Sequence, residues 1–141
     1  MKKILVIGLC PSKISPDFSA FHPATKSRKT LDKWFKSAGV DNNKFEYINV
    51  FFFSNEEVYT RDQKWCQDFE DAMDDLKKYD KIMACGKQVT EEIQKYFNRK
   101  GYNRPIKKML FLPHPSGRNR LLNDPKNVEI MIKDIKRYVN E

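Results

Sequence analysis

Residues 3–12 read KILVIGLCPS, a short apolar run that stops at Gly8 and continues into a proline–serine turn. Four consecutive aliphatic residues, 4–7, are typical of a strand that is buried on both faces of a parallel sheet. A glycine at the end of such a strand lets the backbone approach a ligand closely, and the following turn exposes amide donors. The stretch therefore predicts a buried first strand over residues 3–9, followed by a possible binding loop.

Strand and helix patterns alternate along the rest of the chain. Residues 45–53 are rich in aromatic and β-branched side chains, and short apolar runs occupy 81–85 and 109–112, which predicts three more strands. Apolar residues spaced by three and four positions predict four helices, and Asp124-Pro125 is a typical start for the last one. The helical stripes are Leu31, Trp34, Phe35 and Ala38; Trp65, Phe69, Ala72, Met73 and Leu76; Val89, Ile93 and Phe97; and Val128, Ile132, Ile135 and Val139. This order predicts an α/β fold with a parallel sheet covered by helices on both faces.

Length and composition narrow the class of protein. The 141 residues predict a single domain over 1–141, and the net charge of +8 favours a polyanionic partner. No apolar run approaches the length of a membrane span, and no signal peptide precedes the first strand, so we expect no membrane association. The three cysteines are odd in number and lack metal-ligand spacing. We therefore expect a reduced, cytoplasmic monomer without metal or cofactor.

A second motif follows the last predicted strand, where residues 112–120 read LPHPSGRNR. It offers a neutral imidazole donor, backbone amides and an arginine. In open α/β sheets, ligands bind at the carboxyl edge of the strands, which is where this segment is expected. Taken alone, a histidine at a strand end is more often structural than catalytic.

The two motifs together resemble the uracil-DNA glycosylase superfamily, through G-x-x-P-S over residues 8–12 and H-P-S-G-R-N over residues 114–119. The resemblance implies a three-layer α/β/α fold with a four-stranded parallel sheet in the order 2-1-3-4. It also implies a DNA glycosylase that acts on single- or double-stranded DNA. Such an enzyme hydrolyses the N-glycosidic bond of uracil or another damaged or modified base, which is flipped into a pocket, and leaves an abasic site.

The resemblance assigns catalysis to His114, which would donate a hydrogen bond to the base carbonyl as negative charge develops on the departing base. Cys10 stands where the family often has an Asp or Asn that orients the attacking water. A thiol with an ordinary pKa of ~8.5 orients water weakly at neutral pH. Cys10 therefore keeps an alternative open, a weak or inactive relative that binds DNA or a modified nucleotide in repair signalling or phage–host conflict. A hydrolase of free nucleotides is a third possibility.

Base binding is assigned to Asn49, Phe21, Gly8 and Leu9. Asn49 interrupts an otherwise apolar strand, and it either bonds a neighbouring loop or reads a base edge with its donor and acceptor. Phe21 follows the first motif at about the family's distance and is the candidate for stacking on the base. The identity of the base stays open.

DNA binding is assigned to the loops around these residues. Arg118 is interpreted either as a wedge that fills the gap left by the flipped nucleotide or as a surface contact to phosphate. Ser116 and the amides around Gly117 would grip phosphate in both cases. The remaining candidates are Pro11, Ser12, Asn119 and Arg120.

Overall fold

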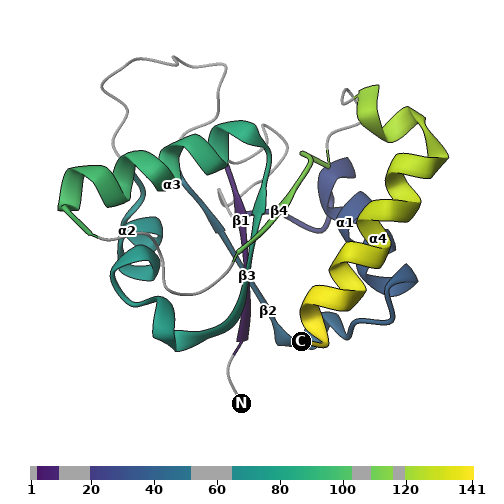
Figure 1. Cartoon of the computed structure of the whole chain (residues 1–141), viewed down its shortest axis with the longest axis horizontal. Helices are drawn as coiled ribbons and strands as arrows, with labels where there is room; N and C mark the ends of the chain where they lie inside the picture. Colours follow the sequence, from purple (N-terminus) through teal and green to yellow (C-terminus); the bar gives the residue numbers. More distant parts are fainter. Residues whose placement is uncertain (1–2, 10–19, 52–64, 103–108, 116–119) are drawn as a thin grey trace.

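The computed structural model describes residues 3–9, 20–51, 65–102, 109–115 and 120–141. Within these ranges, strands and helices alternate along the chain (Figure 1). The elements are strand β1 (Lys3–Gly8), helix α1 (Lys26–Ser37), the short helical turn η1 (Asn42–Lys44), β2 (Phe45–Asn49), α2 (Gln67–Asp74), the turn η2 (Leu76–Lys78), β3 (Tyr79–Cys85), α3 (Lys87–Lys100), β4 (Leu110–Leu112), the turn η3 (Arg120–Asn123) and α4 (Pro125–Val139).

The strands form one parallel sheet in the order β2-β1-β3-β4. β1 lies inside the sheet, where Gly8 is paired with Asn49 of β2. β3 also lies inside the sheet, where Cys85 is paired with Leu112 of the outer strand β4. All four carboxyl ends therefore meet at one edge of the sheet. The predicted α/β class and the strand order 2-1-3-4 are confirmed.

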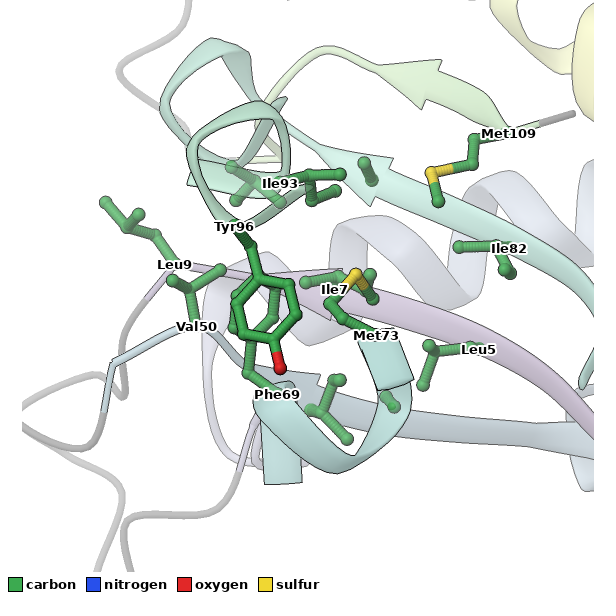
Figure 2. Close-up of a cluster of buried hydrophobic side chains, with 14 of the residues drawn as sticks. Leu5, Ile7, Leu9, Val50, Phe69, Met73, Ile82, Ile93, Tyr96 and Met109 are labelled. Carbon is green, nitrogen blue, oxygen red and sulfur yellow. The ribbon is translucent and has the colours of Figure 1, made fainter. Parts of the chain in front are cut away.

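Helices α2 and α3 cover one face of the sheet, and α1 and α4 cover the other (Figure 1). On the α2/α3 side, Leu5, Ile7 and Ile82 from the strands pack with Phe69 and Tyr96 from the helices (Figure 2). None of these five side chains is measurably exposed. This cluster forms one half of the core.

The α1/α4 side of the sheet has its own buried cluster, which includes Ile4 and Val6 of β1 with Leu31 and Phe35 of α1. Consecutive residues of a strand point to opposite faces. Neighbours in β1 therefore enter different clusters, which explains why the whole run is apolar rather than alternating.

Strand β2 is shorter than predicted, because it ends at Asn49 instead of continuing through the run 45–53. The next two amides still follow β1, since Val50 N–H donates to the Gly8 carbonyl (2.9 Å) and Phe51 N–H to that of Leu9 (2.8 Å). Phe51 then forms an isolated antiparallel bridge with Trp65. The aromatic pattern thus reflects burial beyond the regular strand as well as the strand itself. Residues 52 and 53 lie outside the described residues.

The second predicted helix, whose apolar stripe included Trp65 and Leu76, is shorter than predicted. α2 comprises only residues 67–74, and Leu76 begins the separate turn η2 because Asp75 leaves the helical conformation (φ −138°). Trp65 precedes the helix, yet it packs against the same buried cluster. The three-and-four spacing therefore identified residues that face one core, although they do not share one helix.

The start of α4 is as predicted, with the Asp124 side chain accepting from Lys126 N–H and proline at the first helical position. The predicted buried face is displaced, however. Its fully buried residues are Met131, Ile135 and Tyr138, whereas Val128, Ile132 and Val139 are only partly buried. Tyr138 takes this place because its hydroxyl accepts from Ile82 N–H (3.0 Å) and donates to Ile82 O (3.1 Å). A pattern of aliphatic residues alone misses an aromatic with a polar tip.

Strand β3 also begins earlier than predicted, at Tyr79 rather than at residue 81. A register irregularity against β1 between Lys3 and Ile4 accounts for the broken apolar pattern at this end. Among the helices in the described ranges, none is both long and apolar enough to cross a membrane.

Candidate base-binding site

A cavity of about 40 Å³ opens at the carboxyl edge of the sheet. It lies where β1, β2 and the segment after β4 meet the start of α1. Its walls are formed by Gly8, Leu9, Phe21, Thr25, Ser27, Asn49 and His114. The structure thus brings together all four residues predicted to bind a base and the predicted catalytic histidine, although they come from distant parts of the chain.

Gly8 lines the cavity and leaves no free space for a side chain. A Cβ atom at this position would lie 2.8 Å from Cε2 and Cζ of Phe21 and 3.1 Å from Oδ1 of Asn49. Contacts under 3 Å are repulsive, so a larger residue would displace the phenyl ring or the amide. The glycine therefore allows an aromatic ring and an amide to approach the same stretch of backbone.

Asn49 ends β2 and is paired with Gly8 across the sheet. The residue is 7% exposed, and its amide makes no hydrogen bond to any other residue in the described part of the chain. Burying an amide without a partner costs free energy, on the order of 1–3 kcal/mol. The described residues supply no loop partner, and the neighbouring residues 10–19 and 52–64 lie outside them, so both interpretations from sequence stay predictions. Asn49 lines the cavity, with its Oδ1 3.1 Å from the position of a Cβ on Gly8.

His114 follows β4 by two residues and packs against Gly86, the residue between β3 and α3. A Cβ at Gly86 would lie 3.4 Å from Cβ of His114, and the φ of Gly86 (+102°) is one that side chains rarely adopt. The Gly86 amide also donates to the Leu112 carbonyl at 2.8 Å. Burial lowers the pKa of His114 from its ordinary value of 6.5. The imidazole is therefore neutral at pH 7 and retains an N–H donor, as the sequence interpretation requires.

Phe21 is held in a compact turn before α1. The Thr25 hydroxyl donates to the His22 carbonyl (2.8 Å) and accepts from Arg28 N–H (3.2 Å), which caps the helix. The His22 ring accepts from the Ala24 amide at 3.1 Å. These bonds close the turn and bring Phe21 over the end of β1.

Two cavity residues, Thr25 and Ser27, were not predicted. Thr25 has a visible signal, because a threonine before a helical stripe is a typical N-cap. Ser27 has none, since a serine in a first helical turn is common. Ser27 is half-buried and is one of the residues that line the cavity. The site therefore offers one more polar group than the sequence indicated.

Several predicted site residues lie outside the described residues, namely Cys10, Pro11, Ser12, Ser116, Gly117, Arg118 and Asn119. Their predicted roles stay predictions. Arg120 is described: it begins η3, is exposed, and is not among the residues that line the cavity.

The described cysteines do not contribute reactive groups to the cavity. Cys85 is fully buried in the α1/α4 cluster, and burial raises the pKa of its thiol to about 12. Cys66 is also a free thiol and precedes α2. Within the described ranges, no three His, Cys, Asp or Glu side chains are grouped so that they could hold a metal ion.

Compared with models of known protein families and with curated proteins, the chain gives no match. The chemistry of the site therefore has to be read from its own residues. An aromatic ring, a buried amide and a neutral imidazole surround a small cavity beside exposed backbone. This combination suits a flat, polar ring that can stack on one face and form hydrogen bonds at its edge.

Proposed function

We propose that this protein is a DNA glycosylase that hydrolyses the N-glycosidic bond of uracil or another damaged or modified base and leaves an abasic site. The observation that carries the proposal is the convergence of Phe21, Asn49 and His114 on one cavity above Gly8. The sequence resemblance to uracil-DNA glycosylases assigns base binding or catalysis to these same residues. A flipped base would stack on Phe21 while Asn49 pairs with its polar edge.

In the proposed reaction, water adds to the sugar carbon C1′ as the bond from C1′ to the base nitrogen breaks, the proton that water loses passes to solvent, and the released base anion takes up a proton from solvent. The bonding electron pair leaves with the base, and His114 donates a hydrogen bond to the base carbonyl on which negative charge develops. A donor aimed at charge that exists only in the transition state accelerates the reaction without tightening substrate binding. Burial of His114 supports this role, because it lowers the pKa of the ring and so keeps it neutral.

The dimensions of the site are compatible with a base that is only partly enclosed. A pyrimidine ring is larger than the cavity of about 40 Å³, so a bound base would fill it and extend beyond its rim. The net charge of +8 supports DNA as the partner, because basic surfaces attract the phosphate backbone. We further propose that the protein acts as a monomer in the cytoplasm, where its free thiols stay reduced.

The alternative is a glycosylase-fold protein that binds DNA or a modified nucleotide without cleaving it. One observation favours it: Cys10 occupies the place at which the resembled family often carries a water-orienting Asp or Asn. The two functions share the cavity and differ in whether the bond to the base is broken.

A cleavage assay separates them. Single- and double-stranded oligonucleotides that carry uracil, 5-hydroxymethyluracil or hypoxanthine are incubated with the protein, and abasic products are cut with alkali. For the enzyme, we expect cleavage of one base, which His114→Ala slows about 100- to 1000-fold while oligonucleotide affinity is retained. Binding without cleavage of any base would favour the alternative. Absence of both would reject the nucleic-acid function altogether.

A further inference from the structure

Phe21 has the most unusual backbone in the described part of the chain. It is the only residue there other than glycine with a positive φ, at 49°. Bulky side chains avoid this region because Cβ approaches the neighbouring carbonyl group, so such a conformation persists only where surrounding contacts enforce it. In this protein, contacts from Arg28 and Tyr47 surround the strained residue.

Arg28, in the first part of α1, makes the decisive contacts. Its Nη1 donates to the carbonyl oxygen of Phe21 at 2.9 Å, which fixes the strained residue from its backbone. Its Nε donates to Asp32 Oδ1 at 2.9 Å, which holds the guanidinium in place. Its guanidinium carbon lies 4.2 Å from the centroid of the Tyr47 ring, in cation–π geometry. The Arg28 side chain is only 18% exposed.

Tyr47 completes the arrangement from β2. Its ring meets the Phe21 ring edge to face, with centroids 5.8 Å apart and planes at 63°. Its hydroxyl oxygen is buried and has no hydrogen-bond partner among the described residues, so within them the phenol contributes through its ring. Tyr47 and Asn49 are two residues apart on one strand and therefore point to the same face of the sheet. The contact ties Phe21 to the strand that carries Asn49.

We infer that Arg28 and Tyr47 form a strut that positions Phe21 as the platform for a flipped base, an inference that rests on the proposed glycosylase or base-binding function. Arg28 holds the backbone of Phe21 and Tyr47 holds its ring. Without the strut, Phe21 relaxes to an ordinary backbone conformation and its ring leaves Gly8. Arg28 and Tyr47 are thus positioning residues, and they set how much more tightly the site binds a nucleotide with a base than an abasic site.

The first test needs no ligand. In the wild-type protein, nuclear Overhauser effects are expected between the Phe21 ring protons and the Hα protons of Gly8. Arg28→Gln and Tyr47→Leu should each abolish them, and Tyr47→Phe should retain them because the ring is kept. Arg137→Gln is the matched control, since Arg137 also pairs with an acidic residue on a helix surface but lies on α4. Tyr47→Leu leaves the hydrogen bonds of Arg28 intact, so it provides an independent test if Arg28→Gln does not fold.

The second test measures base recognition. The probes are oligonucleotides with one cleavage-resistant 2′-fluoro nucleotide of uracil, 5-hydroxymethyluracil or hypoxanthine, compared with the same strand carrying a tetrahydrofuran abasic site. Stacking on Phe21 contributes only to the binding of strands that carry a base. We expect Phe21→Ala, Arg28→Gln and Tyr47→Leu each to reduce the preference for the base about tenfold while affinity for the abasic strand is unchanged. The double variant Phe21→Ala/Arg28→Gln should lose no more than Phe21→Ala alone, because Arg28 acts through Phe21.

The outcomes distinguish the strut from the function. If the contacts between Phe21 and Gly8 persist in both strut variants, the inference is overturned, whatever the protein binds. If the contacts are lost and the base preference is unchanged, Phe21 is not the platform and the inference also fails. If the wild-type protein shows no base preference, the proposed function fails, while the spectra still decide whether the strut positions Phe21.

Discussion

The centre of the sheet consists of closely packed apolar side chains, whereas its carboxyl edge contains polar and strained residues. At the centre, Val6, Ile82 and Met83 are fully buried among apolar neighbours. The carboxyl edge, by contrast, contains a polar amide at Asn49, which is only 7% exposed, and a strained backbone at Phe21. Features that cost stability often persist where they serve binding, so their concentration at one edge supports the proposed site. Four measurements test this contrast, and they are given in order of decreasing effect.

The largest effect is expected at the centre. Ile82→Ala removes three buried carbons from β3 and leaves a cavity, which should lower the free energy of unfolding by about 2–5 kcal/mol. Urea denaturation followed by circular dichroism measures this change. The folded fraction should bind oligonucleotides as the wild-type protein does. A change in affinity per folded molecule would show that centre and edge are not separable.

Gly8→Ala tests the edge at its tightest point. The new methyl group would lie 2.8 Å from the Phe21 ring, and displacing the ring costs about 1–3 kcal/mol of stability. We expect a value near the lower limit, because the atoms that must move are at the tip of a side chain. Preference for a base over an abasic site should fall to that of Phe21→Ala. If the preference for a base over an abasic site is unchanged, the base does not bind at Gly8 and Phe21.

Asn49→Ala should separate stability from binding. The amide has no hydrogen-bond partner among the described residues, so its removal should change the free energy of unfolding by less than about 1 kcal/mol, in either direction. Affinity for the base should fall about 5- to 100-fold, since the base edge would lose its paired groups. Asn43→Ala, at an exposed position in η1 just before the same strand, is the control and should change neither stability nor affinity. A large loss of stability in Asn49→Ala would restore the structural interpretation of this residue.

The smallest effect is the pH dependence due to His114. Burial lowers its pKa below 6.5, so between the two pKa values the unfolded chain binds more protons than the folded one. The free energy of unfolding should therefore fall as the pH drops through this window and become constant below it. The acid limb of cleavage should have its midpoint below pH 6.5. Comparison with His114→Gln isolates this contribution, and a midpoint above 6.5 would contradict it.

Much of the fold could be predicted because it follows from local patterns. Runs such as residues 4–7 specify buried strands, and the capping pair Asp124-Pro125 marks a helix start, since both depend on neighbours in the chain. The strand order came from the family resemblance, because periodicity alone does not rank parallel arrangements. The errors occurred where packing replaced periodicity, as at the displaced face of α4, where Tyr138 bonds the backbone of β3.

The alternation of strands and helices, the residues that lie at the carboxyl edge, and the side-chain chemistry of Asn49 and His114 can all be predicted from the amino-acid sequence. The positive φ of Phe21, the place of Ser27 in the cavity, and the contacts of Arg28 and Tyr47 with Phe21 depend on tertiary packing. The physical reason is the range of the interactions involved. Strands and caps depend on a few adjacent residues, whereas the site depends on contacts between α1, β2 and the ends of β1 and β4, which exist only once the sheet has formed.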